Sequence, residues 1–212
     1  MKISIVGMSG SGKTYWSKKL ESEGFKRFCC DDLIEEKLEK ELKHLGYSGI
    51  ADVSKWMGQP FDRKYPTTSK KYLQFEEEVI EEILLGFEKS SDNKNIVIDT
   101  TGSVIYIGES ALKKLTRFTK VIYFKTPDSI KKKMYRLYIQ DPKPVVWGDA
   151  FNKKINETDF EALERCYPKL LAVRARKYGK IANVTLDHKV LHDSTFSISK
   201  FMEAITAIYL TA

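Results

Sequence analysis

The sequence predicts an α/β fold in which about five parallel strands carry helices on both faces. One support is the repeated alternation along the 212 residues, where a short apolar strand pattern gives way to a helical pattern five times. Another is the start of the chain, where a strand pattern leads through a glycine-rich loop into a helical pattern. Strands that alternate with helices form parallel sheets, because each crossover helix returns the chain to the starting edge.

The first strand and the loop after it form a phosphate-binding motif. Residues 3–6 are apolar, and residues 7–14, Gly-Met-Ser-Gly-Ser-Gly-Lys-Thr, fit the pattern G-x-x-x-x-G-K-[ST] ahead of a helix expected over 13–22. The glycines let backbone N–H groups point inward as an anion cradle, to which the helix N-terminus adds its positive dipole end. Lys13, a catalytic candidate, would contact the β- and γ-phosphates, and the Thr14 hydroxyl would bind Mg²⁺. The expected ATP contacts are Gly7, Ser9, Gly10, Ser11, Gly12, Lys13 and Thr14.

The second strand ends at a pair of carboxylates. Residues 25–30 read as a strand, Asp31 and Asp32 follow, and a helix is expected over 33–45. Ligands of open parallel sheets bind at the carboxyl ends of the strands, which is where Asp31 falls. A carboxylate there can accept the proton of a substrate hydroxyl or orient that hydroxyl. The alternative is a helix N-cap, for which Asp32 is the better placed of the two.

An insertion and a third strand come next. Glycines and prolines interrupt residues 46–71, which we interpret as a substrate-side insertion that ends in a polar surface loop over 61–71. An amphipathic helix over 72–88 and a buried strand over 95–99 follow. Asp99 ends that strand as a Walker B acid does, which makes it a candidate Mg²⁺ ligand. A turn-forming role for Asp99 is the alternative.

The second half repeats the strand–helix pattern around a candidate lid. Helices are expected over 108–117, 128–140, 160–176 and from a serine cap at 194 or 197 to about 209, and strands over 120–124 and 182–186. The segment 141–160 is interpreted as a lid that contains Trp147, whose ring either covers a bound ligand or packs within the protein. The insertion and the lid belong to one domain over residues 1–212.

Composition limits the classes of function. The net charge of +7 fits a nucleic-acid surface or a lysine-rich enzyme that handles polyanions, and the even spread of lysines along the chain favours the enzyme. No apolar run is long enough to span a membrane, and three cysteines, Cys29, Cys30 and Cys166, make no disulfide framework. We therefore expect a cytoplasmic protein, monomeric or dimeric, without a membrane partner.

The order of these motifs resembles the shikimate kinase group of small-molecule P-loop kinases. The likeness covers most of residues 1–187 and follows the phosphate-binding loop through four further stretches. These are Asp31-Asp32-Leu33-Ile34-Glu35, similar to the family's Asp and Ile-Glu pair; Tyr72-Leu73-Gln74-Phe75-Glu76, similar to Phe-Arg-x-x-Glu; Lys143-Pro144-Val145-Val146, similar to the lid Arg-Pro-Leu-Leu; and Arg174, Tyr178 and Ala182 at four-residue spacing.

The resemblance implies a P-loop kinase fold, ATP and Mg²⁺ as cofactors, and phosphoryl transfer to a hydroxyl group. It implies that Asp31 holds the substrate hydroxyl, that Arg174 lies beside the acceptor, and that Arg136 lies on the adenine side. It also implies that Lys143 is the lid cation near the transferred group. Ordinary surface charge is the alternative for Lys143, and a solvated helix end is the alternative for Arg174.

Several positions depart from the family in ways that change the expected acceptor. The Mg²⁺-associated Asp of the family falls on Cys29, whose role Asp99 would take over, and the carboxylate-binding Arg falls on Leu73. The family's glycine loop is Thr-Thr-Gly here, with Thr101 and Gly102 as candidate acceptor contacts. Because a carboxylate needs a fork-shaped cationic partner, we expect an acceptor other than shikimate.

The sequence thus predicts ATP- and Mg²⁺-dependent phosphoryl transfer to a hydroxyl of a small molecule. One alternative is a nucleoside, nucleotide or nucleic-acid-end kinase, which the basic charge and the cations at 174–177 favour. The other is an ATP-binding regulatory protein without turnover, which the departures at Cys29 and Leu73 allow.

Overall fold

Five parallel strands form the central sheet of the computed structural model, which describes residues 1–89 and 94–210. The strand order is β2-β3-β1-β4-β5, which confirms the predicted α/β fold with a five-stranded parallel sheet. The strands are β1 (Lys2–Gly7), β2 (Lys26–Cys29), β3 (Ile96–Asp99), β4 (Lys120–Lys125) and β5 (Val184–Asp187).

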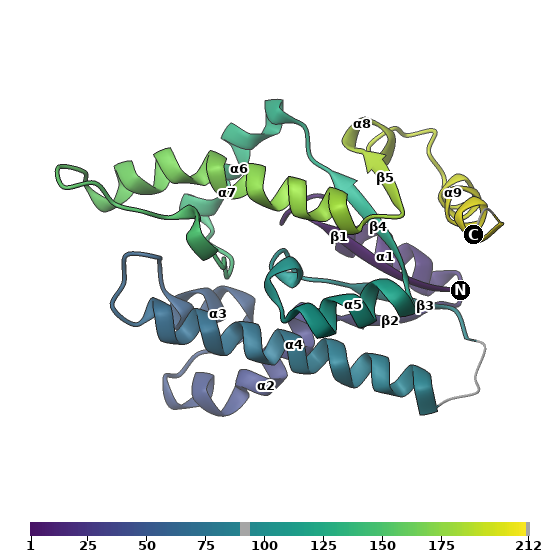
Figure 1. Ribbon diagram of the computed structural model, residues 1–212, viewed down its shortest axis with the longest axis horizontal. Coiled ribbons are helices and arrows are strands. Elements are labelled where there is room, and N and C mark those ends of the chain that lie inside the picture. The colour runs from purple at the N-terminus through teal and green to yellow at the C-terminus, as the bar shows by residue number, and fades with distance from the viewer. Residues whose placement is uncertain (90–93, 211–212) are drawn as a thin grey trace.

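Helices cover both faces of this sheet (Figure 1). They are α1 (Lys13–Ser22), α2 (Cys30–His44), α3 (Gly49–Met57), α4 (Tyr65–Lys89), α5 (Glu109–Phe118), α6 (Asp128–Gln140), α7 (Asp159–Ile181), α8 (His188–Leu191) and α9 (Ile198–Leu210), with short 3-10 turns η1 (Val104–Tyr106) and η2 (Gly148–Ala150). In the part of the chain that the structure describes, no helix is both long and apolar enough to cross a membrane.

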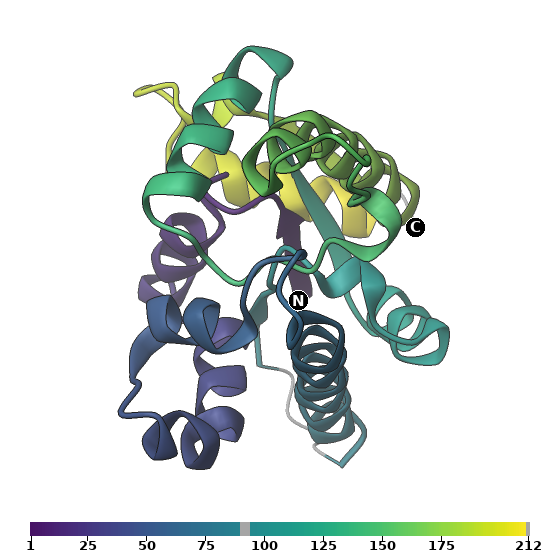
Figure 2. The same cartoon turned by 90° about the vertical axis from the view of Figure 1, so that its left-hand side faces the viewer.

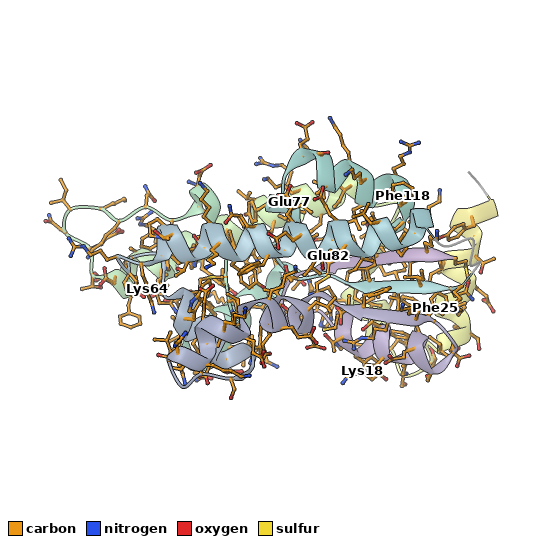
Figure 3. All side chains as sticks on the ribbon, turned by 90° about the horizontal axis from the view of Figure 1, so that it is seen from below. Lys18, Phe25, Lys64, Glu77, Glu82 and Phe118 are labelled. Carbon is orange, nitrogen blue, oxygen red and sulfur yellow. The ribbon has the colours of Figure 1, made fainter. Side chains whose placement is uncertain are left out.

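The strands divide their side chains between two cores, because successive residues of a strand point to opposite faces. In β4, Val121 and Tyr123 pack with α2 to α7, whereas Ile122 and Phe124 pack with α1, α8 and α9. The larger core lies on the side of α4, the long helix that contains Glu77 and Glu82 (Figure 3). The three central strands, β3, β1 and β4, are largely buried on both faces, which accounts for their mostly apolar sequences, whereas the edge strands β2 and β5 are partly exposed.

The insertion is more helical than its glycines and prolines suggest. The predicted polar loop over 61–71 is wrong from Tyr65 onward, because α4 begins there. Pro66 lies in the first turn of α4, where its missing N–H removes no helical hydrogen bond. Tyr65 is buried, and α3 buries Val53, Trp56 and Met57 against the same core.

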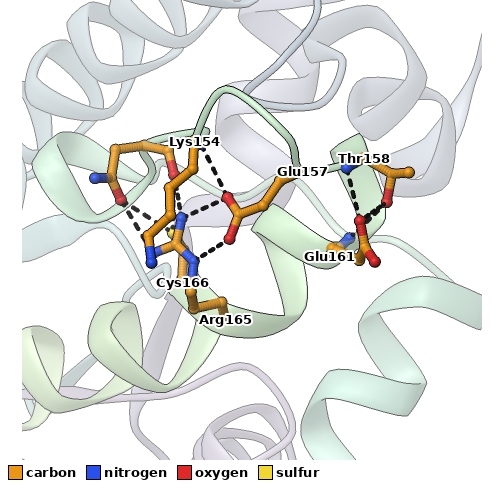
Figure 4. A network of polar contacts seen from close by, with 7 residues as sticks. Lys154, Glu157, Thr158, Glu161, Arg165 and Cys166 are labelled. Carbon is orange, nitrogen blue, oxygen red and sulfur yellow. Dashed lines mark hydrogen bonds and ion pairs between the residues drawn. The ribbon is translucent and has the colours of Figure 1, made fainter.

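The beginning of α7 is fixed by two polar clusters (Figure 4). The Thr158 hydroxyl accepts from the backbone N–H of Glu161, and the Glu161 carboxylate accepts from the backbone N–H of Thr158. This reciprocal arrangement satisfies N–H groups that the first helical turn leaves open. Beside it, Arg165 donates to both carboxylate oxygens of Glu157, from Nε at 2.5 Å and from Nη2 at 2.7 Å.

Within the predicted lid, residues 145–147 are tied to the rest of the protein. The Tyr65 hydroxyl donates to the Val145 carbonyl at 3.0 Å and accepts from the Trp147 N–H at 2.7 Å. The Trp147 side chain is fully buried and packs edge-on against the rings of Tyr138 and Tyr167. Trp147 is therefore a core side chain, whereas most of the loop around Ile155 is exposed.

Replacing Trp147 by Ala should lower the free energy of unfolding by about 3–5 kcal/mol, because it leaves a large cavity among packed aromatic rings. Urea denaturation followed by circular dichroism measures this loss. Ile155→Ala is the matched control and should change stability by less than about 0.5 kcal/mol, since Ile155 is fully exposed. Equal losses for the two variants would contradict the packing role of Trp147.

Candidate nucleotide and acceptor site

The glycine-rich loop connects β1 to α1 and turns tightly. Gly10 and Gly12 have φ values of 75° and 94°, in the left-handed region that other residues rarely adopt. The Ser11 N–H donates to the Met8 carbonyl at 3.2 Å, which closes the turn. Because α1 begins at Lys13, the free N–H groups of its first turn face the loop. This is the strand–loop–helix context that the motif requires.

Lys13 folds over this loop. Its ammonium group donates to the carbonyl oxygens of Gly7 and Met8, both at 3.2 Å, and the side chain is buried. Thr14, the next residue, is exposed at the start of α1. The structure therefore places a cation and a free hydroxyl at the mouth of the loop.

Asp31 lies in the first turn of α2. Burial raises the pKa of the Asp31 carboxyl, while Lys13 lowers it and Asp99 raises it further. A hydrogen bond with Tyr72 also lowers the pKa. Lys13 and Asp99, two other predicted site residues, are thus near enough to Asp31 to influence its charge.

The alternative interpretation of Asp31 or Asp32 as the N-cap of α2 is wrong. The helix begins at Cys30, and Cys29 is the N-cap residue without a capping side-chain hydrogen bond. β2 passes into α2 with no intervening loop, so Asp31 and Asp32 both lie inside the first turn. Carboxylates at that position are favoured by the positive end of the helix dipole. Cys29 is partly exposed and Cys30 is buried, and burial raises the pKa of both thiols.

Asp99 is held by two neighbours that the sequence patterns did not indicate. Its Oδ2 atom accepts from the Ser17 hydroxyl and from Nη2 of Arg27, each at 3.0 Å. Nε of Arg27 also donates to the Ser17 hydroxyl at 2.8 Å, so the three side chains form a closed triangle. Among the described residues, no hydrogen bond engages the other oxygen, Oδ1. The sequence offered one indication that Arg27 lies near Asp99. Arg27 stands two residues before Cys29 on β2, and such residues share a face of the sheet.

The donor set at the loop fits Mg²⁺. Thr14 and Asp99 offer hard oxygen atoms from α1 and the end of β3. Over residues 1–89 and 94–210, no three His, Cys, Asp or Glu side chains gather into a metal cage. Mg²⁺ does not require one, because it keeps several waters and takes substrate phosphate oxygens beside one or two protein ligands.

A buried carboxyl of α4 contacts the residues that follow β3, where acceptor contacts are predicted. Glu76 of α4 is fully buried and accepts hydrogen bonds from the Thr101 hydroxyl and, at 2.6 Å, from the Ser103 hydroxyl. Burial raises the pKa of Glu76 to about 7, although both hydroxyl bonds and Arg174 lower it and Asp31 raises it. The sequence indicated Thr101 as a candidate contact, and it matched Glu76 to the Glu of Phe-Arg-x-x-Glu without assigning it a role.

Arg174 and Gly102 lie against each other on the same side. A Cβ atom at Gly102 would come within 2.9 Å of Nη1 of Arg174, so only glycine leaves room for the guanidinium. Arg174 is buried and donates from Nη2 to the Val146 carbonyl at 2.8 Å, whereas its Nε has no partner. The Tyr178 hydroxyl donates to the Gly102 carbonyl at 2.5 Å. The alternative of a solvated helix end is therefore wrong for Arg174.

The two lid-side cations are placed differently. Lys143 lies beside Asp141 at 3.0 Å and lines a cavity of about 590 Å³ that also touches Ser9 and Gly10 of the loop. Arg136 of α6 is exposed and does not line this cavity, which Lys133 and Leu137 of the same helix do. Other lining residues are Thr126, Ile130, Met134, Tyr138, Asp141, Val145, Tyr167, His188 and His192.

The sheet edge, the loop and the lid side together could hold a nucleotide triphosphate next to a hydroxyl acceptor. The cations Lys13 and Lys143 suit phosphate oxygens, and the Asp31 carboxylate suits a hydroxyl proton. Figure 2 shows this arrangement from the side, with the 141–147 connection crossing between the α6–α7 pair and the α2–α4 helices.

Glu76→Gln should remove a pH dependence of stability. The carboxyl has a folded pKa of about 7 against an ordinary value of 4.5, so the folded state holds its proton more tightly than the unfolded state. Its contribution is fully present below about pH 4.5 and is lost as the pH rises through about 7. The free energy of unfolding should therefore fall from pH 4.5 to 8 by up to about 3 kcal/mol more in the natural protein than in Glu76→Gln.

Urea denaturation at several pH values measures this difference. Glu36→Gln, which alters an exposed carboxyl on α2, is the control and should keep the slope of the natural protein. Parallel slopes for the natural protein and Glu76→Gln would contradict the raised pKa.

Comparison with known proteins gives matches among solved structures alone. No family model matches the chain, and no curated protein matches it. Shikimate kinase from Acinetobacter baumannii, in complex with shikimate, has a TM-score of 0.60 and 20% identity over 99% of this chain and 93% of its own. Shikimate kinase from Bacteroides thetaiotaomicron has a TM-score of 0.59 and 15% identity over 97% and 98% of the two chains. TT1252 from Thermus thermophilus has a TM-score of 0.55 and 16% identity over 98% and 96%. The chain thus has a shikimate kinase-like fold, as its motif order predicts.

Proposed function

We propose that this protein transfers the γ-phosphoryl group of ATP to a hydroxyl group of a small molecule. The observation that carries the proposal is the phosphate-binding loop with the Lys13 ammonium folded over it, together with Asp31, which is near enough for Lys13 to lower its pKa. Phosphoryl transfer depends on positioning and charge, and this pair combines a group for the acceptor with a group for the phosphates. The fold shared with two shikimate kinases agrees with the proposal.

The loop side holds the nucleotide. Backbone N–H groups from Ser9 to Thr14 would cradle the phosphates, and Lys13 would turn from the Gly7 and Met8 carbonyls toward the phosphate oxygens. Bound Mg²⁺, held by Thr14 and Asp99, would neutralise charge on the phosphates. Lys143 would place a further cation on the transferred group from the lid side.

The acceptor side is lined by Asp31 and by the Glu76, Thr101 and Arg174 groups. Asp31 would orient the acceptor hydroxyl and take its proton, and burial raises its pKa toward the range of an effective base. Thr101 and Gly102 follow β3 at the same edge of the sheet. The unpartnered Nε of Arg174 is a donor for a polar group of the acceptor.

The acceptor is a molecule other than shikimate. Leu73 occupies the helix position where the resemblance places a carboxylate-binding arginine, and it offers no donor. One N–H of the Arg174 guanidinium already binds the Val146 carbonyl, so fewer of its five donors remain for an acceptor carboxylate. These two features support an acceptor recognised mainly through hydroxyl or other neutral polar groups.

Asp31→Asn should reduce phosphoryl transfer by about 10²–10⁴-fold while ATP affinity changes less than about twofold, because the change removes the base and keeps the shape. The measurement is ATP-dependent phosphorylation across a panel of hydroxyl-bearing metabolites, nucleosides and oligonucleotides, with ATP binding followed by calorimetry. Lys13→Ala is the comparison variant and should lose ATP binding itself.

Each result of this experiment decides between the functions considered. Transfer to oligonucleotide ends with steep salt dependence would instead indicate a nucleic-acid-end kinase. ATP binding by the natural protein without transfer to any hydroxyl would indicate a regulatory role and overturn the proposal. A loss of ATP affinity in Asp31→Asn would overturn the role of Asp31.

A further inference from the structure

The carboxylate of Asp99 is restrained on one of its two oxygens. Oδ2 accepts both the Ser17 hydroxyl and Nη2 of Arg27 at 3.0 Å, and no described group bonds Oδ1. The side chains of Arg27 and Asp99 are 11% and 4% exposed, so solvent does little to loosen the ion pair. The Arg27–Ser17 bond at 2.8 Å completes the triangle and fixes the rotation of the carboxylate.

The sheet places this carboxylate at the end of β3, beside the strand that leads into the loop. Asp99 is the register partner of Cys29 on β2 and of Ile5 on β1, two residues before the loop begins at Gly7. Ser17 lies one helical turn after Thr14 on α1, so the triangle joins the phosphate-binding helix to two strands. Arg27 and Cys29 share a face of β2, which lets the guanidinium reach the Asp99 side chain on the neighbouring strand.

Restriction to one oxygen matters for the choice of metal. Ca²⁺ takes six to eight oxygen ligands in flexible geometry and often binds a carboxylate through both oxygens. Mg²⁺ takes six in near-octahedral geometry and is satisfied by single oxygens from few protein groups. A carboxylate whose second oxygen is occupied by Arg27 and Ser17 therefore suits Mg²⁺ better than Ca²⁺.

We propose that Arg27 is a positioning residue that confines Asp99 to one metal-facing oxygen and thereby favours Mg²⁺ over Ca²⁺ at the phosphate-binding loop. The inference rests on the proposed function, because it takes the metal to be bound together with ATP. It adds a selectivity role for Arg27 that acts through Asp99, without contact between Arg27 and the nucleotide.

The test measures the dissociation constants of Mg²⁺ and Ca²⁺ for the protein saturated with a non-hydrolysable ATP analogue. Displacement of Mn²⁺ followed by electron paramagnetic resonance gives both constants without any need for turnover. In Arg27→Met, Asp99 can turn and offer both oxygens, so the ratio of the Ca²⁺ constant to the Mg²⁺ constant should fall about tenfold. Arg117→Gln, which alters an exposed arginine on α5, should leave the ratio unchanged.

A second variant covers the case in which Arg27→Met does not fold. Arg27→Lys keeps the positive charge but lacks the fork that bonds Asp99 and Ser17 at the same time. Its ratio should also fall, by about threefold to tenfold.

The ratio separates selectivity from general loosening of the site. A loss of affinity by the same factor for both metals, or an unchanged ratio in a folded Arg27 variant, overturns the role of Arg27. Unchanged Mn²⁺ binding in Asp99→Asn overturns it too, while leaving the kinase proposal intact. Absence of metal-dependent binding of the ATP analogue in the natural protein would overturn both proposals.

Discussion

Three neighbouring parallel strands that end at one edge of the sheet are the constraint on which the site depends. β1 runs into the glycine-rich loop at Gly7, β2 delivers Asp31, and β3 ends at Asp99. Parallel pairing fixes these ends in register, with Cys29 beside Asp99 and Asp99 beside Ile5. Residues far apart in the chain therefore meet at one place without any long loop to position them.

Charged and polar side chains at this edge of the sheet contact one another in a mostly buried setting. Asp99 is paired with Arg27, and Asp31 is influenced by Lys13. On the acceptor side, Glu76 receives two hydroxyl donors, and Arg174 gives one of its donors to the Val146 carbonyl. Isolated charges in such a place would be costly, and contacts between different elements reduce this cost for Asp99 and Glu76. This cross-linking also keeps α1, α4 and α7 in fixed positions around the edge.

The sequence was sufficient for the sheet, most helices and the loop, because their signals are local. Alternating apolar runs mark the strands, and the glycine-rich motif carries its own strand and helix context. The start of α4 was missed because Pro66 was interpreted as a helix breaker, although proline is favoured in a first turn. The Arg27–Ser17–Asp99 triangle and the Glu76 bonds are long-range contacts, and no spacing along the chain indicates which side chains will meet across strands and helices.

Cys29 and Asp99 are neighbours in the sheet although they are far apart in the chain. A carboxylate expected at the end of β2 is absent, and one stands at the adjoining position of β3. In the linear sequence, one motif residue is missing at Cys29, and the aspartate lies 70 positions later, outside the motif. Across the sheet, the two positions are register partners on neighbouring strands, one strand spacing of about 4.8 Å apart. A sequence motif records spacing along the chain and not which residues are neighbours across strands. A motif search therefore misses a side chain that stands at the same edge of the sheet on a different strand.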